Sequence, residues 1–154
     1  NWTYYAAGVE RIAAQLAQDL GSPLAAGSVA LAVTAGGSVV GGGPEAGGVS
    51  APDTDVRAAR EQAALLAQLF PSFTVAFTGQ ADPWADLAIL AACDGIVSGA
   101  STFGWWAAYL SGLPGSRVVV PRTVVLPTHA LDKEFTIADH YPPDWTPMTN
   151  WGAG

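Results

Sequence analysis

The chain has 154 residues, of which 50% are hydrophobic and only 12% are charged. A chain of this length suits one packed domain and is short for two. Thirteen acidic residues against six basic ones give a net charge of −7, and the basic residues form no cluster, which argues against nucleic acid as a partner. The apolar runs are too short and too often interrupted to span a membrane. We therefore expect one globular domain, without a membrane span in this segment.

The chain begins at Asn1 rather than Met, and it enters an amphipathic pattern without the basic and apolar regions of a signal peptide. We interpret it as a piece of a longer protein. Any anchor or partner domain is then expected upstream of Asn1.

Helical and strand patterns alternate along the chain. Apolar residues at helical spacing predict a helix over residues 4–20, and further helices are predicted over 56–69, from 83 onward and over 102–110. Short apolar runs predict strands at 29–33, 73–77, 95–97 and 117–120. Continuously apolar strands between helices are typical of parallel sheets covered on both faces. The sequence therefore predicts an α/β domain with a Rossmann-like parallel sheet and helices on both faces.

Two segments are predicted to lack regular structure. Residues 36–52 are rich in glycine and proline and indicate a surface loop. Residues 121–154 begin with Pro121 and carry further prolines at 142, 143 and 147, which leave room for short helical turns only. We expect this tail to wrap over the surface of the domain.

The turn from Ser98 to Thr102 lies between a predicted strand and a predicted helix. One hydroxyl would be enough to cap the helix, but Ser98, Ser101 and Thr102 supply three. Gly99 and Ala100 add backbone N–H groups that a ligand can approach closely. The unpaired N–H groups and the dipole of the helix N-terminus both favour an anion. The sequence therefore predicts a phosphate-binding turn.

The same turn permits a second interpretation as the nucleophile elbow of a hydrolase. Residues 99–103 resemble the pattern G-x-S-x-G around Ser101, and Asp139 and His140 follow in the chain order of a triad. Phe103 replaces the second glycine of the pattern. A serine hydrolase is therefore kept as the weaker alternative.

Two other motifs favour a structural role. Residues 39–46 match the dinucleotide fingerprint G-x-G-x-x-A, but the glycines and the proline that follow break the helix that this motif requires. Trp105, Trp106 and Tyr109 share one short apolar helix. We expect that helix to be buried nearly all round and its aromatic residues to pack in the core.

Asp86 lies near the start of the helix predicted from residue 83. A carboxylate in a first helical turn often does no more than stabilise the helix dipole. It could instead accept the paired N–H donors of a purine edge. The residues alone leave both interpretations open.

The segment from Asp86 to Gly112 resembles the α-1,2-fucosyltransferase family. Its members carry a D-x-x-L-L-x-x-C block followed by T-F-G-x-W-A-A-Y-L or S-F-S-W-W-G-A-Y-L, and this chain has Thr-Phe-Gly-Trp-Trp-Ala-Ala-Tyr-Leu at residues 102–110. Fainter similarity extends to both sides. The resemblance implies that residues 1–154 form the C-terminal, nucleotide-sugar-binding domain of a GT-B-like glycosyltransferase, with the acceptor domain upstream.

The resemblance also implies a reaction, in which L-fucose moves from GDP-fucose to the 2-hydroxyl of a terminal galactose with inversion. Asp86 would face the guanine, and the phosphates would lie against Gly99, Ser101, Thr102 and Phe103. The resemblance implies no metal and no further cofactor, and it assigns no catalytic residue to this chain.

The family's arginine motif, H-x-R-R-x-D, is absent from this sequence. We therefore expect the chain alone to be inactive, and a non-catalytic nucleotide-binding module remains an alternative. A parent of the animal type is expected in the Golgi membrane with a luminal catalytic domain, and any other parent in the cytoplasm.

Overall fold

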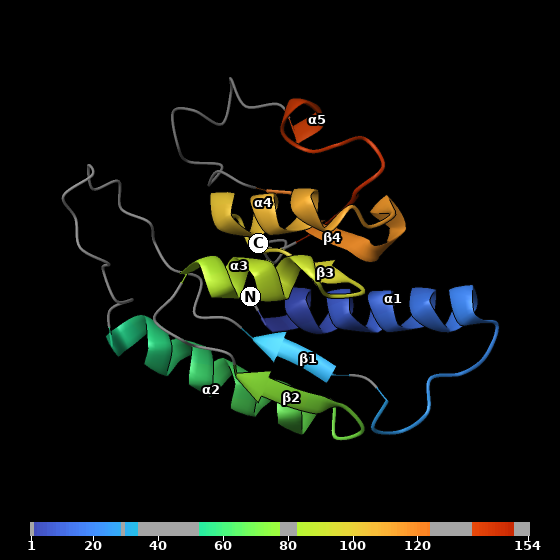
Figure 1. Cartoon of the computed structure of the whole chain (residues 1–154), viewed down its shortest axis with the longest axis vertical. Coiled ribbons are helices and arrows are strands. Elements are labelled where there is room, and N and C mark those ends of the chain that lie inside the picture. The colour runs from blue at the N-terminus through green and yellow to red at the C-terminus, as the bar shows by residue number, and fades with distance from the viewer. Residues whose placement is uncertain (1, 29, 34–52, 78–82, 124–136, 150–154) are drawn as a thin grey trace. The chain divides into compact units, whose positions relative to one another are not determined.

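The structure is a computed structural model that describes residues 2–28, 30–33, 53–77, 83–123 and 137–149 (Figure 1). The chain divides into two compact units. Unit 1 comprises Asn1–Pro23 and Cys93–Gly154, and unit 2 comprises Leu24–Ala92. Two compact units are compatible with one domain, so the single domain predicted over residues 1–154 stays a prediction. The loop predicted over residues 36–52 lies outside the described residues.

In its described residues, unit 2 contains a two-stranded parallel sheet and two helices. Its elements are β1 (Ala30–Val33), α2 (Asp53–Leu69), β2 (Thr74–Phe77) and α3 (Pro83–Ala91). β1 and β2 lie side by side in Figure 1 and pair in parallel, with Ala30 opposite Thr74. α2 packs on both strands and buries Ala63 and Leu66, which lie three residues apart and so share one face of the helix.

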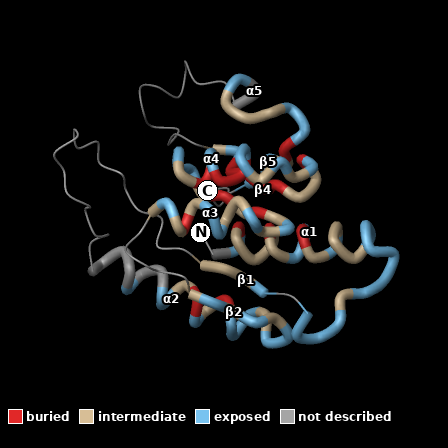
Figure 2. The backbone as a smooth tube through the Cα atoms, viewed as in Figure 1, coloured by how far each residue is buried: buried red, intermediate tan, exposed pale blue. Residues whose placement is uncertain are grey.

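The described part of unit 1 contains a three-stranded parallel sheet in the order β3-β4-β5, with β4 in the middle. Its elements are α1 (Trp2–Leu20), β3 (Ile96–Val97), α4 (Thr102–Ser111), the 3₁₀ turn η1 (Gly115–Arg117), β4 (Val118–Pro121), α5 (Ile137–His140) and β5 (Thr146–Met148). All four residues of β4 are buried, and Figure 2 shows this buried strand in red. The core of unit 1 therefore lies around β4.

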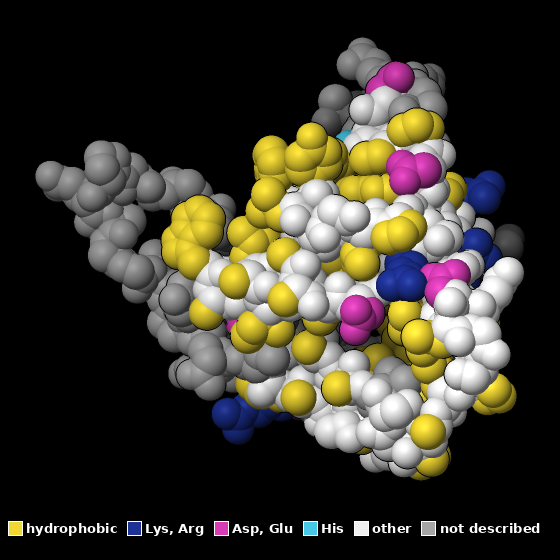
Figure 3. Space-filling model, turned by 45° about the vertical axis from the view of Figure 1, so that its right-hand side comes forward, with side chains coloured by type: hydrophobic (Ala, Val, Ile, Leu, Met, Phe, Trp, Pro, Cys, Tyr) yellow, Lys and Arg dark blue, Asp and Glu magenta, His cyan; other side chains and the backbone are white. Residues whose placement is uncertain are grey.

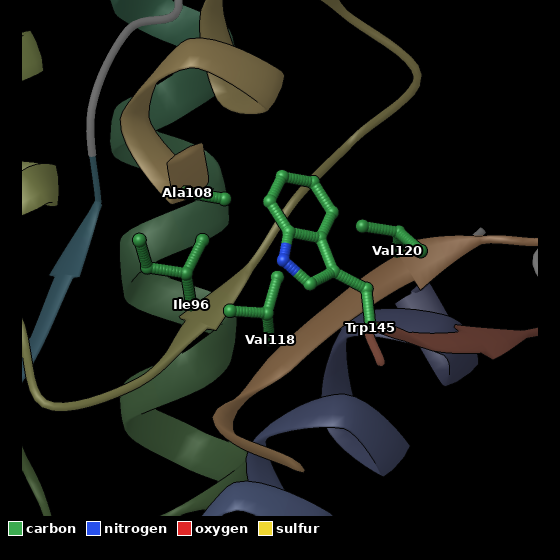
Figure 4. Close-up of a cluster of buried hydrophobic side chains, with 5 residues drawn as sticks. All are labelled: Ile96, Ala108, Val118, Val120 and Trp145. Atoms are coloured by element: carbon green, nitrogen blue, oxygen red, sulfur yellow. The ribbon is translucent and has the colours of Figure 1, made fainter. Parts of the chain in front are cut away.

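One face of β4 packs against α4 and the tail. Val118 and Val120 point to this face and contact Ala108 of α4, Ile96 of β3 and Trp145. Figure 4 shows the indole ring of Trp145 among these four side chains. All five residues are at most 7% exposed, and Trp145, at that value, is the most accessible of them. Trp145 thus contributes the largest side chain of this cluster.

The other face of β4 packs against α1. Side chains alternate between the faces of a strand, so Val119 points away from Trp145 and contacts Tyr4 and Ile12 instead. Helices therefore cover both faces of this sheet, as the sequence predicts. The α/β class is confirmed, but the described strands form two small sheets where the sequence predicts one. Hydrophobicity marks the strands without specifying their pairing partners.

Two further expectations from the sequence are wrong. The tail is not irregular throughout, because β5 adds a strand to the sheet through Thr146 opposite Val119 and Pro147 opposite Val120. Pro147 is tolerated because β5 is an edge strand, where a missing N–H donor need not break the sheet. α4 is not buried all round either, since Trp106 is 48% exposed and Tyr109 is 56% exposed.

Candidate functional site

The turn between β3 and α4 is held in place by backbone hydrogen bonds. The Ser98 N–H donates to the Val119 carbonyl over 2.9 Å, which continues the pairing of β3 with β4, and the Ser101 N–H donates to the Gly99 carbonyl over 2.9 Å. The buried Ser98 hydroxyl also donates to the Gly99 carbonyl, over 2.9 Å. Ser98 therefore stabilises the turn, and Ser101 and Thr102 are the hydroxyl residues exposed at its surface.

Ser101 caps the N-terminus of α4. Its backbone is extended, with φ −138° and ψ 144°, and its hydroxyl oxygen accepts a hydrogen bond of 3.1 Å from the Gly104 N–H. This is the usual geometry of a serine N-cap. The hydroxyl hydrogen is not needed for capping, so Ser101 keeps a donor that could reach a ligand.

Beyond the cap, the first turn of α4 contains further backbone N–H groups. Thr102 and Phe103 occupy the first two helical positions, where backbone N–H groups have no acceptor within the helix. Thr102 is exposed and Phe103 is half-buried. The helix dipole places partial positive charge at this end. The arrangement favours an anionic group above Thr102.

Two glycines allow close contacts around this turn. A Cβ atom on Gly104 would collide with the Ser98 hydroxyl and would lie 3.3 Å from the Ser101 hydroxyl. A Cβ atom on Gly99 would lie 2.8 Å from the Tyr5 hydroxyl oxygen. The sequence predicts that Gly99 lets a pyrophosphate approach, but the structure also places the end of the Tyr5 side chain against it.

α1, at the start of the chain, also supports the turn. The Tyr4 hydroxyl donates a hydrogen bond of 2.7 Å to the Ser98 carbonyl. Tyr4 is 4% exposed, and burial is the main reason that its pKa is raised above the usual tyrosine value. This contact was not predicted from the sequence. The sequence did contain a signal that this face of α1 packs inward. Tyr4, Gly8 and Ile12 follow one another at i, i+4 spacing, and all three are buried.

The five predicted nucleotide-binding residues fall into both units. Gly99, Ser101, Thr102 and Phe103 lie together in unit 1, whereas Asp86 lies in unit 2, in the first turn of α3. Asp86 is only 4% exposed. Its predicted role as the reader of the base stays a prediction.

Arg117, a basic residue of unit 1, forms an ion pair within its own unit. The Arg117 Nε donates a hydrogen bond of 2.8 Å to an Asp19 carboxylate oxygen, and the terminal nitrogen Nη2 forms a salt bridge of 2.7 Å with the same oxygen. In the view of Figure 3, basic side chains (dark blue) reach the surface, and one of them lies beside acidic atoms (magenta). Arg117 is therefore committed to holding η1 against the C-terminal end of α1.

The described residues offer neither a metal-binding cluster nor a membrane-spanning helix. Within the described ranges, no three His, Cys, Asp or Glu side chains group in a way that could hold a metal ion. In the part of the chain that the structure describes, no helix has both the length and the apolar character needed to cross a membrane.

The sequence is similar to known glycosyltransferases. A family model described as glycosyl transferase family 11 matches residues 70–149, which is slightly more than half of the 154 residues. The chain belongs to glycosyl transferase family 11. The family match runs through α3, β3, the turn and α4, so it includes all five predicted nucleotide-binding residues.

A curated relative agrees with this family. The chain is similar to galactoside alpha-(1,2)-fucosyltransferase 1 of Saimiri sciureus, with 38% identity over 66 residues that make up 43% of this chain and 17% of the relative. The similarity thus spans about a sixth of the length of that protein. No solved structure matches the chain significantly. The resemblance to the α-1,2-fucosyltransferase family, expected from residues 86–112, is confirmed.

The hydrolase alternative loses its support. The serine of a nucleophile elbow lies on a sharp, strained turn, whereas Ser101 has ordinary extended backbone angles and its hydroxyl accepts the capping hydrogen bond. His140 lies in α5, where its carbonyl accepts a hydrogen bond of 2.8 Å from the Trp105 indole, and burial lowers the pKa of its imidazole. The chain also belongs to a glycosyltransferase family, which is not a family of hydrolases.

Proposed function

We propose that this chain is the nucleotide-sugar-binding part of a fucosyltransferase that transfers L-fucose from GDP-fucose to the 2-hydroxyl of a terminal galactose, with inversion. The observation that carries the proposal is the family match over residues 70–149, which includes the strand, the turn and the open N-terminus of α4. The name of the Saimiri sciureus relative supports the fucosyl donor and the galactoside acceptor. For a parent of the animal type, the proposal includes a Golgi location.

The turn suits a nucleoside diphosphate as a leaving group. As the bond between fucose and the diphosphate breaks, negative charge grows on the diphosphate. The N–H groups of Thr102 and Phe103 and the Ser101 hydroxyl would donate to these oxygens, and the dipole of α4 would favour their charge. Such donors already have their final orientation, so they need no rearrangement during the reaction.

Asp86 is the proposed reader of the base. A carboxylate can accept two hydrogen bonds at once, and the edge of guanine presents paired N–H donors. Asp86 is buried, where such hydrogen bonds are stronger than in water. Loss of this carboxylate would therefore reduce the preference for guanine more than the affinity for diphosphates in general.

Calorimetric titration with GDP, GDP-fucose, UDP and ADP tests the proposal. We expect GDP and GDP-fucose to bind at least about tenfold more tightly than UDP and ADP. Thr102→Ala should weaken all diphosphates, whereas Asp86→Asn should mainly weaken the two guanine nucleotides. Asp94→Asn, which changes an exposed carboxylate, is the matched control and should bind as the unaltered chain does. Equal affinity for all four nucleotides would contradict the proposal.

A non-catalytic nucleotide-binding module is the second candidate. The observation that favours it is the pairing of Arg117 with Asp19, which withdraws a basic residue of unit 1 from the diphosphate. Both candidates predict binding of GDP-fucose by this chain. They differ in the complete gene product, which would transfer labelled fucose to a galactoside if it is an enzyme and would bind GDP-fucose without transfer if it is not.

A further inference from the structure

The first turn of α1 is fixed against the turn that follows β3. Tyr4 is buried and donates its hydrogen bond of 2.7 Å to the Ser98 carbonyl. The rings of Tyr4 and Tyr5 meet edge to face, with centroids 5.1 Å apart and planes at 71°. Because Tyr4 is held by the sheet and by Ser98, the neighbouring Tyr5 has a defined position as well.

The Tyr5 side chain ends at the backbone of the turn. A Cβ atom on Gly99 would lie 2.8 Å from the Tyr5 hydroxyl oxygen, a distance that real Cβ contacts essentially never show. Glycine at position 99 is therefore what lets this hydroxyl approach. Burial raises the pKa of the Tyr5 phenol. A protonated phenol can donate a hydrogen bond to an anionic oxygen.

We propose that the Tyr5 hydroxyl is a further phosphate-binding group, which donates to a diphosphate oxygen held at the Ser98–Thr102 turn, with Tyr4 as its positioning residue. The inference rests on the proposed function, because it assumes a nucleoside diphosphate at this turn. A phenol O–H donating to an anionic phosphate oxygen forms a charge-assisted hydrogen bond. Tyr4 and Tyr5 lie outside the residues that the family model matches, so the contact would be contributed by this chain's own α1.

Calorimetry of the full 154-residue chain with GDP and with inorganic pyrophosphate tests the inference. Tyr5→Phe removes one hydroxyl and should weaken both ligands by about tenfold, the usual effect of losing a charge-assisted hydrogen bond. Tyr109→Phe makes the same chemical change on the exposed side of α4 and should leave both affinities unchanged. Melting followed by circular dichroism should show that both variants remain folded at the temperature of the titration.

A double-mutant cycle on stability tests the contact independently of any ligand. Gly99→Ala should destabilise the chain because its methyl group displaces the Tyr5 hydroxyl, and it should destabilise the Tyr5→Phe background less. Additive effects of the two changes would contradict the placement of Tyr5 at Gly99.

The outcomes separate the inference from the proposed function. If GDP binds and Tyr5→Phe binds it equally well, the inference is wrong and the proposed function stands. If Tyr5→Phe weakens GDP but not pyrophosphate, the hydroxyl contacts another part of the nucleotide and the inference is again wrong. If the unaltered chain binds UDP and ADP as well as GDP, the proposed function fails, whereas equal weakening of all diphosphates by Tyr5→Phe would still support the phosphate contact.

Discussion

Gly104 lies so close to Ser98 that a Cβ atom at position 104 would collide with the Ser98 hydroxyl. Ser98 is buried and its hydroxyl donates to the Gly99 carbonyl, so it cannot move away without breaking that hydrogen bond. The third residue of the Thr-Phe-Gly motif is therefore a glycine for a steric reason, since a side chain at position 104 would not fit. It lets the first turn of α4 pack against the end of β3 while its own N–H donates to Ser101.

Gly104→Ala should destabilise the chain by about 1 to 3 kcal/mol, the range found when extra methyl groups are forced into packed sites. Ser98→Ala removes the atom that collides, so the double variant should lose less stability than the sum of the two single changes. Urea unfolding of the four proteins measures this coupling. A strictly additive result would show that the Gly104 and Ser98 positions do not share a contact.

The two roles of Ser101, as helix cap and as phosphate donor, can be separated by substitution. Asp and Asn cap helices about as well as Ser, so Ser101→Asp and Ser101→Asn should both keep the stability of the chain. Ser101→Asp places a carboxylate at the proposed diphosphate site and should weaken GDP at least about tenfold through charge repulsion. Ser101→Asn is the neutral control and should bind GDP far better than Ser101→Asp. Equal GDP affinities would place the diphosphate elsewhere.

Local sequence patterns were sufficient to place most helices and strands. The helical spacing of apolar residues located α1. α4 begins at the predicted residue 102, because the capping Ser101 marks its start and Gly112, whose backbone is in the left-handed conformation, marks its end. The turn at residues 98–102 was located for the same reason. These features depend on residues that are neighbours along the chain.

The features that were missed depend on contacts between distant residues. The hydrogen bond from Tyr4 to the Ser98 carbonyl joins residues 94 positions apart. β5 was missed because its proline argues against a strand, and only its place at the sheet edge makes that proline harmless. The apolar composition of α4 could not reveal that Ala107 and Ala108 are buried while Trp106 stays exposed.

Trp145 should carry much of the stability of unit 1. Its ring fills the space between Ala108, Val118 and Val120, so Trp145→Ala leaves a cavity in the core and should destabilise the chain by about 3 to 5 kcal/mol. Trp106→Ala removes an equally large side chain that is 48% exposed, and it should have a much smaller effect. Thermal and urea unfolding would measure both, and equal losses would contradict the described core.

The ion pair between Asp19 and Arg117 predicts a pH dependence of stability. Hydrogen bonds from Arg117 and Gln15 lower the pKa of the Asp19 carboxyl in the folded chain. A carboxyl whose pKa is lowered by folding stabilises the fold above its unfolded pKa, and it loses this contribution as the pH falls through the folded pKa. Asp19→Asn should therefore unfold at a lower urea concentration than the unaltered chain at pH 7, and the difference should shrink below about pH 4. Glu10→Gln, which also removes an exposed carboxylate from the same helix, is the control. A gap between Asp19→Asn and the unaltered chain that stays constant with pH would mean that the carboxylate charge does not contribute to stability.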